Sequence, residues 1–203
     1  MSQKIISRTT KIDLETLKKA SVFGDFYLAG GTGLALQLQH RVSLDLDFFT
    51  PKRINAKVLI QKIKKLGKLS IEKEAEDTLV CRFNRTRLTF LRYDYPLLFS
   101  FKKIEGIKVA DTKDIACMKI GAISSRGTKK DFIDLFFICQ KIPLKKILAL
   151  FKRKYKSVSY NVIHILKSLT YFEDAEKDLV PKMITPVSWL RIKSFFEKEI
   201  KRI

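Results

Sequence analysis

The hydrophobic pattern of this 203-residue chain changes period several times, which predicts a mixture of helices and strands. Residues 12–23 have the spacing of an amphipathic helix, with candidate core positions at Ile12, Leu14, Leu17 and Val22. The apolar run 26–29 predicts a short strand that ends at a glycine pair. We expect a short apolar helix and a second strand to follow before Pro51.

The second strand contains the run Leu-Asp-Leu-Asp-Phe-Phe, which alternates with a period of two. This period places Asp45 and Asp47 on one face and Leu44, Leu46 and Phe48 on the other. The two carboxylates are then roughly 7 Å apart along the strand and raise each other's pKa unless a cation lies between them. Mg2+ suits such a site because it binds carboxylate and phosphate oxygens.

The glycine pair after the first strand predicts an anion-binding turn. Gly30 and Gly31 are followed by Thr32, which we expect to cap the next helix. The backbone N–H groups and the positive end of the dipole at a helix start attract a phosphate. The three residues are therefore candidates for holding phosphates whose metal is bound by the two aspartates.

The later pattern combines strands with helices. Asn55 is a candidate N-cap for a helix over 55–66, with Val58, Leu59, Ile63 and Leu66 on its apolar face. Strands are expected at 69–72, 78–83 and 87–93, the last two joined by a hairpin at Asn84 and Arg85. Further helices are expected from Asp111 to residue 123, from Asp131, over 159–171, and over 186–201 with Thr185 as N-cap.

Three charged residues on these helices have two interpretations each. Lys119 lies among apolar residues, so it either reaches inward to a triphosphate or packs its stem on the core with its amine outward. Asp131 and Asp134, at i and i+3, share one side of their helix. They either complement the helix dipole or belong to a catalytic site.

Composition and charge favour a folded protein with a polyanionic partner. Apolar residues make up 46% of the chain, and 41 basic against 21 acidic residues give a formal charge of +20. Nucleic acid is the natural partner for this charge, although lysine-rich proteomes produce similar compositions. Two runs, 52–68 and 141–156, contain basic residues and no acidic ones. Each run is either a solvated face or part of an RNA-binding surface.

Other features favour a cytoplasmic location. Cys81, Cys117 and Cys139 are isolated in apolar surroundings, which is typical of reduced core residues. The first twenty residues lack the apolar segment of a signal peptide, and we expect no membrane-spanning segment.

Two blocks of residues together resemble a known family, the AbiEii/AbiGii-type nucleotidyltransferase toxins of the DNA polymerase beta-like nucleotidyltransferase superfamily. The first block consists of Gly30, Gly31, Thr32, Arg41, Ser43, Asp45, Asp47, Phe48 and Phe49. The second has a lysine and an arginine seven residues apart, followed by Asp-x-x-Asp: Lys119, Arg126, Asp131 and Asp134.

The resemblance implies an α+β fold, with a polymerase beta-like core, a small mixed sheet flanked by helices, over residues 1–140. A basic helical region, 141–203, is expected to pack on it. It also implies an Mg2+-dependent enzyme that transfers a nucleotide from a nucleoside triphosphate (NTP) to RNA, such as the 3′ end of a tRNA. The protein is then the toxin of a toxin–antitoxin or phage-defence system, with a cognate antitoxin as partner.

The resemblance also assigns roles to residues. The expected metal ligands are Asp45 and Asp47, the expected further catalytic residues are Lys119 and Asp131, and the expected nucleotide contacts are Gly30, Gly31, Thr32, Arg41, Ser43 and Arg126. Asp131 either pairs with Lys119 or acts as the base for the acceptor hydroxyl, and Ser43 either contacts a phosphate or ends a turn. Many enzymes of the superfamily have a third carboxylate on a later strand, where this chain has Thr89 and Arg92, with Asp94 near the strand end.

This departure leaves open whether one or two metals bind, and it leaves two alternatives. One is a catalytically silent fold that binds RNA or protein. The other is a nucleotidyltransferase that modifies a small molecule or a protein hydroxyl, for which the basic runs are incidental.

Overall fold

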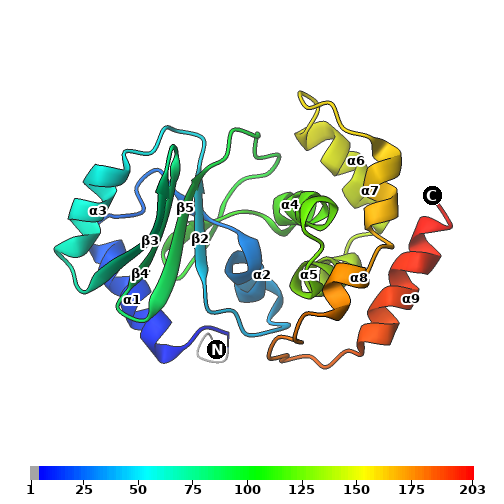
Figure 1. The fold of residues 1–203 in the computed structure, drawn as a ribbon, viewed down its shortest axis with the longest axis horizontal. Helices are drawn as coiled ribbons and strands as arrows, with labels where there is room; N and C mark the ends of the chain where they lie inside the picture. Colours follow the sequence, from blue (N-terminus) through cyan, green and yellow to red (C-terminus); the bar gives the residue numbers. More distant parts are fainter. Residues whose placement is uncertain (1–4) are drawn as a thin grey trace.

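The computed structural model describes residues 5–203 and contains a seven-stranded mixed sheet with helices on both sides (Figure 1). The strands are β1 (Tyr27–Leu28), β2 (Leu46–Thr50), β3 (Leu69–Ala75), β4 (Thr78–Phe83), β5 (Thr86–Arg92), β6 (Lys102–Ile104) and β7 (Ile107–Val109). The helices are α1 (Arg8–Lys19), α2 (Gly30–Leu38), α3 (Ala56–Lys64), α4 (Thr112–Ser125), α5 (Lys129–Cys139), α6 (Leu144–Lys154), α7 (Val162–Ser168), α8 (Glu173–Glu176) and α9 (Trp189–Ile200). The predicted α+β class is confirmed.

The sheet brings distant parts of the sequence together at its centre. Its strand order is β3-β4-β5-β2-β1-β7-β6. Strand β2 runs antiparallel to β1 and parallel to β5, and β1 runs parallel to β7. The run that contains Asp45 and Asp47 therefore lies between the glycine turn after β1 and the middle of β5.

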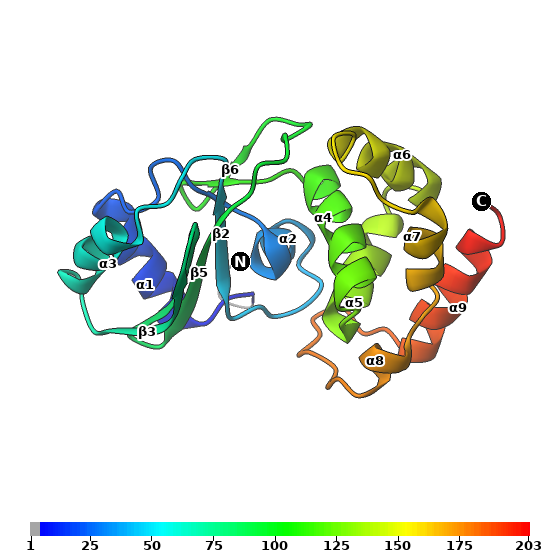
Figure 2. The same cartoon turned by 45° about the horizontal axis from the view of Figure 1, so that its top comes forward.

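The helices form layers on the two faces of the sheet. Helices α1 and α3 lie against one face, and α2 lies on the other side of β2, next to α4 and α5 (Figures 1 and 2). One cluster of buried apolar residues joins α1 and α3 to the inner faces of β4 and β5. A second cluster joins α2, α4 and α5 to α6, α7 and α9, including contacts of Phe132 with Phe196.

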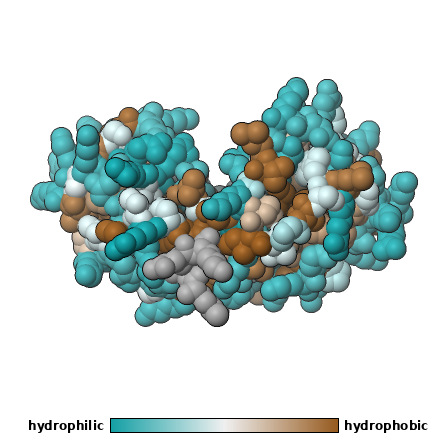
Figure 3. Space-filling view, turned by 90° about the horizontal axis from the view of Figure 1, so that it is seen from below, coloured by the Kyte–Doolittle hydropathy of each residue, from teal (hydrophilic) through white to brown (hydrophobic). Residues whose placement is uncertain are grey.

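The molecular surface is hollowed between the end with the strands and the end with the C-terminal helices (Figure 3). The second apolar cluster crosses residue 140, because it contains residues of both α5 and α9. The division into a core of 1–140 and a helical region of 141–203 stays a prediction. Within residues 5–203 no helix has the length and apolar character that crossing a bilayer requires.

Several local predictions are confirmed. The Asn55 side chain caps α3 by accepting a hydrogen bond from the Val58 N–H at 3.1 Å. Strands β4 and β5 form the expected hairpin, and Asn84 has a left-handed φ of 50° in its turn. Strand β2 ends at Thr50, directly before Pro51.

Other element boundaries were wrong. Helix α1 begins at Arg8 because the Ser7 hydroxyl accepts from the Thr10 N–H, and Ile12 is 58% exposed rather than buried. Val58 is also exposed on α3. Helix α9 begins at Trp189, where Ser188 rather than Thr185 is the N-cap.

Further differences concern α7 and the sheet edge. Helix α7 is shorter than the predicted segment 159–171. Strands β6 and β7, each of three residues, were not expected, because segments so short carry little periodic signal.

The two basic runs lie at opposite ends of the molecule. The run 52–68 includes α3, which lies at the end with the strands, and the run 141–156 includes α6, at the other end (Figure 1). Lys154 of the second run is fully buried and forms an ion pair with Asp114 at 2.8 Å. The two runs therefore do not form one continuous surface, and a role of either run in RNA binding stays a prediction.

Candidate active site

The first part of the site is the start of α2, which follows β1 directly. Gly30 has a φ of +60°, a conformation that favours glycine. A Cβ atom at Gly30 would lie 2.7 Å from Oδ2 of Asp47, and one at Gly31 would overlap the Arg41 guanidinium. Both glycines therefore allow the helix start to approach the charged residues. The N–H groups of the first helical turn have no i−4 carbonyl within the helix, so they are available to an anion.

Thr32 has a different place from the one predicted. Helix α2 begins at Gly30, with Ala29 as N-cap, so Thr32 lies inside the first turn. Its hydroxyl is fully buried, lies 2.8 Å from Ser43 Oγ and donates to the backbone carbonyl of Asp45. The Thr32 and Ser43 side chains therefore fix the segment that leads into β2, and only the Thr32 backbone N–H is left for a phosphate.

Asp45 and Asp47 lie at the start of β2. Asp47 is within the strand on the face opposite Leu46 and Phe48, which are fully buried. Asp45 directly precedes the strand, and Leu44 is 60% exposed, so the expected buried position of Leu44 was wrong. Burial raises the pKa of Asp47, and the charge of Asp45 raises it further against the lowering effect of a hydrogen bond from Thr89.

Strand β5 supplies the neighbours of these carboxylates. Thr89 is directly beside Asp47 in the parallel register of β2 and β5. It occupies the place next to the aspartate pair where a third carboxylate was sought. Asp94 lies beyond the strand end and pairs with Arg92 at 2.7 Å. Arg87 lies on the same strand, lines the cleft described below and interacts electrostatically with both Asp45 and Asp47.

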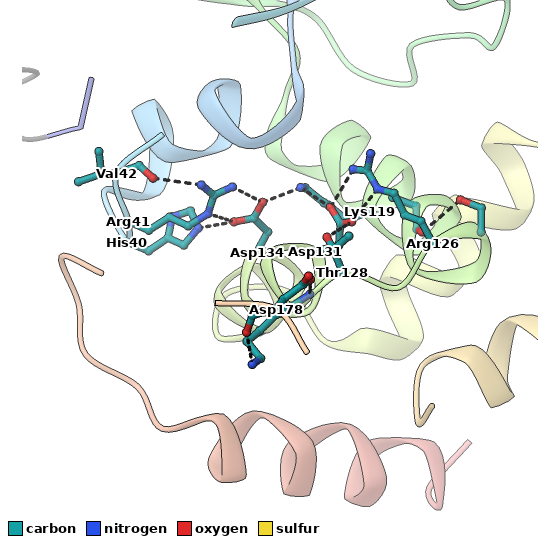
Figure 4. A network of polar contacts seen from close by, with 12 residues as sticks. His40, Arg41, Val42, Lys119, Arg126, Thr128, Asp131, Asp134 and Asp178 are labelled. Atoms are coloured by element: carbon teal, nitrogen blue, oxygen red, sulfur yellow. Dashed lines mark hydrogen bonds and ion pairs between the residues drawn. The ribbon is translucent and has the colours of Figure 1, made fainter. Parts of the chain in front are cut away.

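A buried charged cluster lies between α4 and α5 (Figure 4). Lys119 points inward, and its Nζ contacts Asp131 Oδ1 at 2.8 Å and Asp134 Oδ2 at 2.6 Å. Burial opposes the charge of Lys119, but the two carboxylates outweigh it and raise its pKa. The Lys119 amine therefore points inward rather than outward, and its contact with a triphosphate stays a prediction.

Asp131 is surrounded by donors. Besides Lys119, Arg126 Nε donates to it at 3.0 Å and the Thr128 hydroxyl at 2.7 Å. Burial alone would raise the pKa of Asp131, but the Lys119 charge and the Arg126 hydrogen bond lower it. A carboxylate with a lowered pKa and this many partners is a weak base, so Asp131 fits the ion-pair interpretation.

Arg41 lies on the other side of Asp134 (Figure 4). Its Nε and Nη2 donate to the two Asp134 oxygens at 2.7 and 2.8 Å, and its Nη1 donates to the Val42 carbonyl. His40 Nε2 also contacts Asp134, at 2.7 Å. The buried guanidinium of Arg41 therefore positions Asp134, and its expected contact with a nucleotide stays a prediction.

These groups lie beside a cleft of about 620 Å³ between the sheet and the helices. Its polar lining includes Gly30, Gly31, Asp47, Arg87, Thr89, Lys119, Arg126 and Asp131. Arg126 is the C-cap of α4, and its side chain is 64% exposed. The cleft therefore brings the anion-binding turn, one of the two aspartates and three cations, Arg87, Lys119 and Arg126, to a single space.

Part of the lining of the cleft is aromatic. This aromatic wall consists of Tyr93, Tyr95, Phe151, Tyr155 and Tyr160. The rings contact one another edge to face, with centroids 4.8 Å apart for Tyr95 and Tyr155 and 5.2 Å apart for Phe151 and Tyr160. Such a wall presents flat apolar surfaces on which a nucleobase stacks.

The donor set suits Mg2+ with substrate phosphates. Among residues 5–203 no group of three or more His, Cys, Asp or Glu side chains is placed to hold a metal. Asp45 and Asp47 are the expected metal ligands, and Mg2+ is commonly bound by one or two carboxylates with phosphates and water as its other ligands. Burial is the main cause of the raised pKa of Asp47, and the neighbouring charge of Asp45 adds to it.

Some residues of the cleft were not singled out from the sequence. Arg87 and the aromatic wall belong to this group, and Thr89 was considered only as a missing carboxylate. The i, i+2 spacing of Tyr93 and Tyr95 was a usable signal for two rings on one side of an extended segment. For Arg87 no local signal existed, because its position depends on the pairing of β5 with β2.

Comparisons with known proteins agree with this geometry. The family model described as nucleotidyl transferase AbiEii toxin, type IV TA system, matches residues 12–96. An uncharacterized protein of Aquifex aeolicus (strain VF5) is 40% identical over 194 residues, which is 93% of this chain and 92% of that protein.

Two solved structures share the fold. MenT4, a nucleotidyltransferase toxin from Mycobacterium tuberculosis H37Rv, aligns with a TM-score of 0.59 and 14% identity over 95% of this chain and 84% of its own. JHP933 from Helicobacter pylori aligns with a TM-score of 0.57 and 18% identity over 96% of this chain and 91% of its own. With the family match and the cleft that joins the glycine turn to the β2 carboxylates, the chain belongs to the AbiEii nucleotidyltransferase toxin family and is a nucleotidyltransferase.

Proposed function

We propose that this protein is an Mg2+-dependent nucleotidyltransferase that transfers a nucleotide from an NTP to RNA, with the 3′ end of a tRNA as acceptor. In this proposal it is the toxin of a toxin–antitoxin or phage-defence pair, and its partner is a cognate antitoxin protein. The single observation that carries the reaction is the approach of the α2 start to Asp47, with Lys119 and Arg126 lining the same cleft.

The donor nucleotide fits the cleft in one orientation. Its phosphates lie at the N–H groups of Gly30, Gly31 and Thr32, and Arg126 and Lys119 compensate their charge. Its base stacks on the aromatic wall. When bound by Asp45 and Asp47, Mg2+ supplies Lewis-acid polarisation of the phosphoryl oxygens.

The reaction is an in-line displacement at the α-phosphorus. The acceptor oxygen forms the new bond, the bond to the bridging oxygen breaks, pyrophosphate leaves, and the acceptor proton is released to water. Asp131 and Asp134 hold Lys119 in place for this step. Because such catalysis depends on positioning and electrostatics, loss of a metal-binding carboxylate costs several kcal/mol of barrier.

We assign RNA as the acceptor from the net charge of the protein. A formal charge of +20 favours a polyanion over a neutral small molecule. The free cysteines Cys81, Cys117 and Cys139 fit a reducing compartment, so we assign the reaction to the cytoplasm. Thr89 in place of a third carboxylate favours one of the two competing functions, a silent fold that binds RNA or protein.

A labelling experiment tests the proposal. The purified protein is incubated with total tRNA, Mg2+ and each of four α-labelled NTPs in turn. The native protein should label RNA with at least one NTP, and an Asp45→Ala/Asp47→Ala variant should not. An Asp94→Ala variant, which removes a carboxylate outside the cleft, should keep the activity. Binding of tRNA without any labelling would support the silent fold. Label on the protein itself, or on an added aminoglycoside alone, would support a protein or small-molecule acceptor.

A further inference from the structure

The face of the sheet that carries Asp47 continues outward over β5, β4 and β3. Residues opposite one another on neighbouring strands share a face. Thr89 is opposite Asp47, Val80 is opposite Thr89, and Lys73 is opposite Val80. A row of side chains therefore leads from the β2 carboxylate to an exposed lysine at the sheet edge.

A second row lies beside the first, two residues along β5 and β4. Arg87 on β5 is directly opposite Arg82 on β4. Glu72 holds both guanidinium groups, with Arg87 Nε at 2.7 Å from its Oε2 and Arg82 Nη2 at 3.0 Å from its Oε1. A β-bulge between Ile71 and Lys73 leaves Glu72 as the extra residue of β3.

Both arginines keep donors for another partner. Their side chains are 38% and 46% exposed, for Arg87 and Arg82 respectively. A guanidinium has five N–H donors, and each of these two uses one in its hydrogen bond to Glu72. Glu72 thus fixes two cations side by side and uses only one donor of each guanidinium.

The geometry of the reaction separates the two sides of Asp47. The start of α2, Lys119 and Arg126 lie on one side, where the departing pyrophosphate is held in the proposed function. In-line displacement requires the acceptor to approach from the opposite side. Across β2 from α2 lies β5, with Thr89 and Arg87 facing the cleft.

We propose that Arg87, Arg82 and Lys73, here named the β3–β5 strip, bind the phosphodiester backbone of the acceptor RNA next to its reacting end. This inference rests on the proposed function, and it assigns that function an acceptor surface. The strip is continuous with the aspartates. The lysines of α3, by contrast, lie behind the opposite face of the sheet (Figures 1 and 2), and those of α6 belong to the helical end.

The test compares two variants of equal charge. Arg82→Gln/Arg87→Gln removes the two arginines of the strip, and Lys57→Gln/Lys65→Gln removes two exposed lysines of α3 and its C-cap. Surface ion pairs contribute little to stability, so both variants should fold, which circular dichroism checks. Unfractionated tRNA is the probe for both binding and label transfer.

The strip variant should raise the KM for tRNA at least tenfold, and by a larger factor than the KM for the NTP, whose cleft Arg87 also lines. The slope of log binding constant against log salt should fall by about 1.4, since each phosphate contact on a single strand contributes about 0.7. An Arg82→Lys/Arg87→Lys variant should restore most of the slope. Equal KM values and slopes for the strip and α3 variants would overturn the proposal.

Binding is measured separately from transfer, so the two failures remain distinct. If the native protein labels no RNA, the proposed function fails, and the binding slope still decides whether the strip contacts RNA. If the native protein labels RNA and the strip variant does so with unchanged constants, only the acceptor surface is wrong.

Discussion

Asp134 is the carboxylate on which the buried charged cluster depends, and its replacement tests the energetics of the site. It accepts from Arg41 and contacts His40 and Lys119, and its side chain is fully buried. In Asp134→Asn the two cations remain buried without their common anion. Removing one partner of a buried ion pair lowers the free energy of unfolding by about 3–5 kcal/mol. For a chain of this length each kcal/mol lowers Tm by about 2–4 °C, so we expect a decrease of about 6–20 °C.

The same variant has a defined pH dependence. Burial alone would raise the pKa of Asp134, but the Lys119 charge and the Arg41 hydrogen bonds outweigh it and hold the pKa well below its usual range. For a carboxyl group with a depressed pKa, the stabilisation is complete above the unfolded pKa of about 3.9 and is lost as pH falls towards the folded pKa. The stability difference between native protein and Asp134→Asn should therefore be constant near pH 7 and shrink below about pH 4.

Urea denaturation followed by circular dichroism at several pH values measures both effects. Asp94→Asn is the control, because Asp94 pairs with Arg92 at the surface and its loss should cost no more than about 1 kcal/mol. A loss below 1 kcal/mol for Asp134→Asn at pH 7, or a difference that stays constant down to pH 3, would refute this account of the cluster.

Three further replacements test other parts of the structure. Gly30→Ala should lose about 1–3 kcal/mol in urea denaturation and at least tenfold in kcat, because Gly30 has a positive φ and a Cβ there would lie 2.7 Å from a β2 carboxylate oxygen. Gly24→Ala, with no atom within 4 Å of the added Cβ, should be neutral in both assays. Tyr160→Ala should raise the KM for the NTP about tenfold in steady-state kinetics if a base stacks on the aromatic wall, and an unchanged KM would place the base elsewhere. Lys154→Met should lower the free energy of unfolding by about 3–5 kcal/mol because it leaves buried Asp114 without its cation, and a neutral result would mean that Asp114 is neutralised in another way.

The local parts of the site were predictable from sequence. The glycine turn, the two aspartates at the start of β2 and the common side of Asp131 and Asp134 follow from spacing alone, because backbone geometry repeats every 2 or 3.6 residues. The Asn55 cap and the turn at Asn84 were predictable for the same reason, since each depends on a few neighbouring residues. The family resemblance gave the fold class, which the observed sheet and helices confirm.

Prediction failed where two local rules competed. Threonine is a preferred residue at helix N-caps, yet α2 begins at Gly30 and the Thr32 hydroxyl donates to the Asp45 carbonyl. Ile12 fits an apolar helical face, but α1 begins at Arg8 and turns this residue to solvent. In each case the helix began earlier than expected, and the start is the boundary that local pattern determines least.

The sequence by itself determined which residue types face the same way on each strand and helix, because that depends on backbone period. Only the tertiary structure decided which of these faces meet. The pairing of Arg41 with Asp134 joins residues 93 positions apart, and the position of Thr89 beside Asp47 depends on parallel pairing of β2 with β5. Such contacts depend on sheet register and on helix packing, which bring together distant segments whose local patterns carry no information about each other.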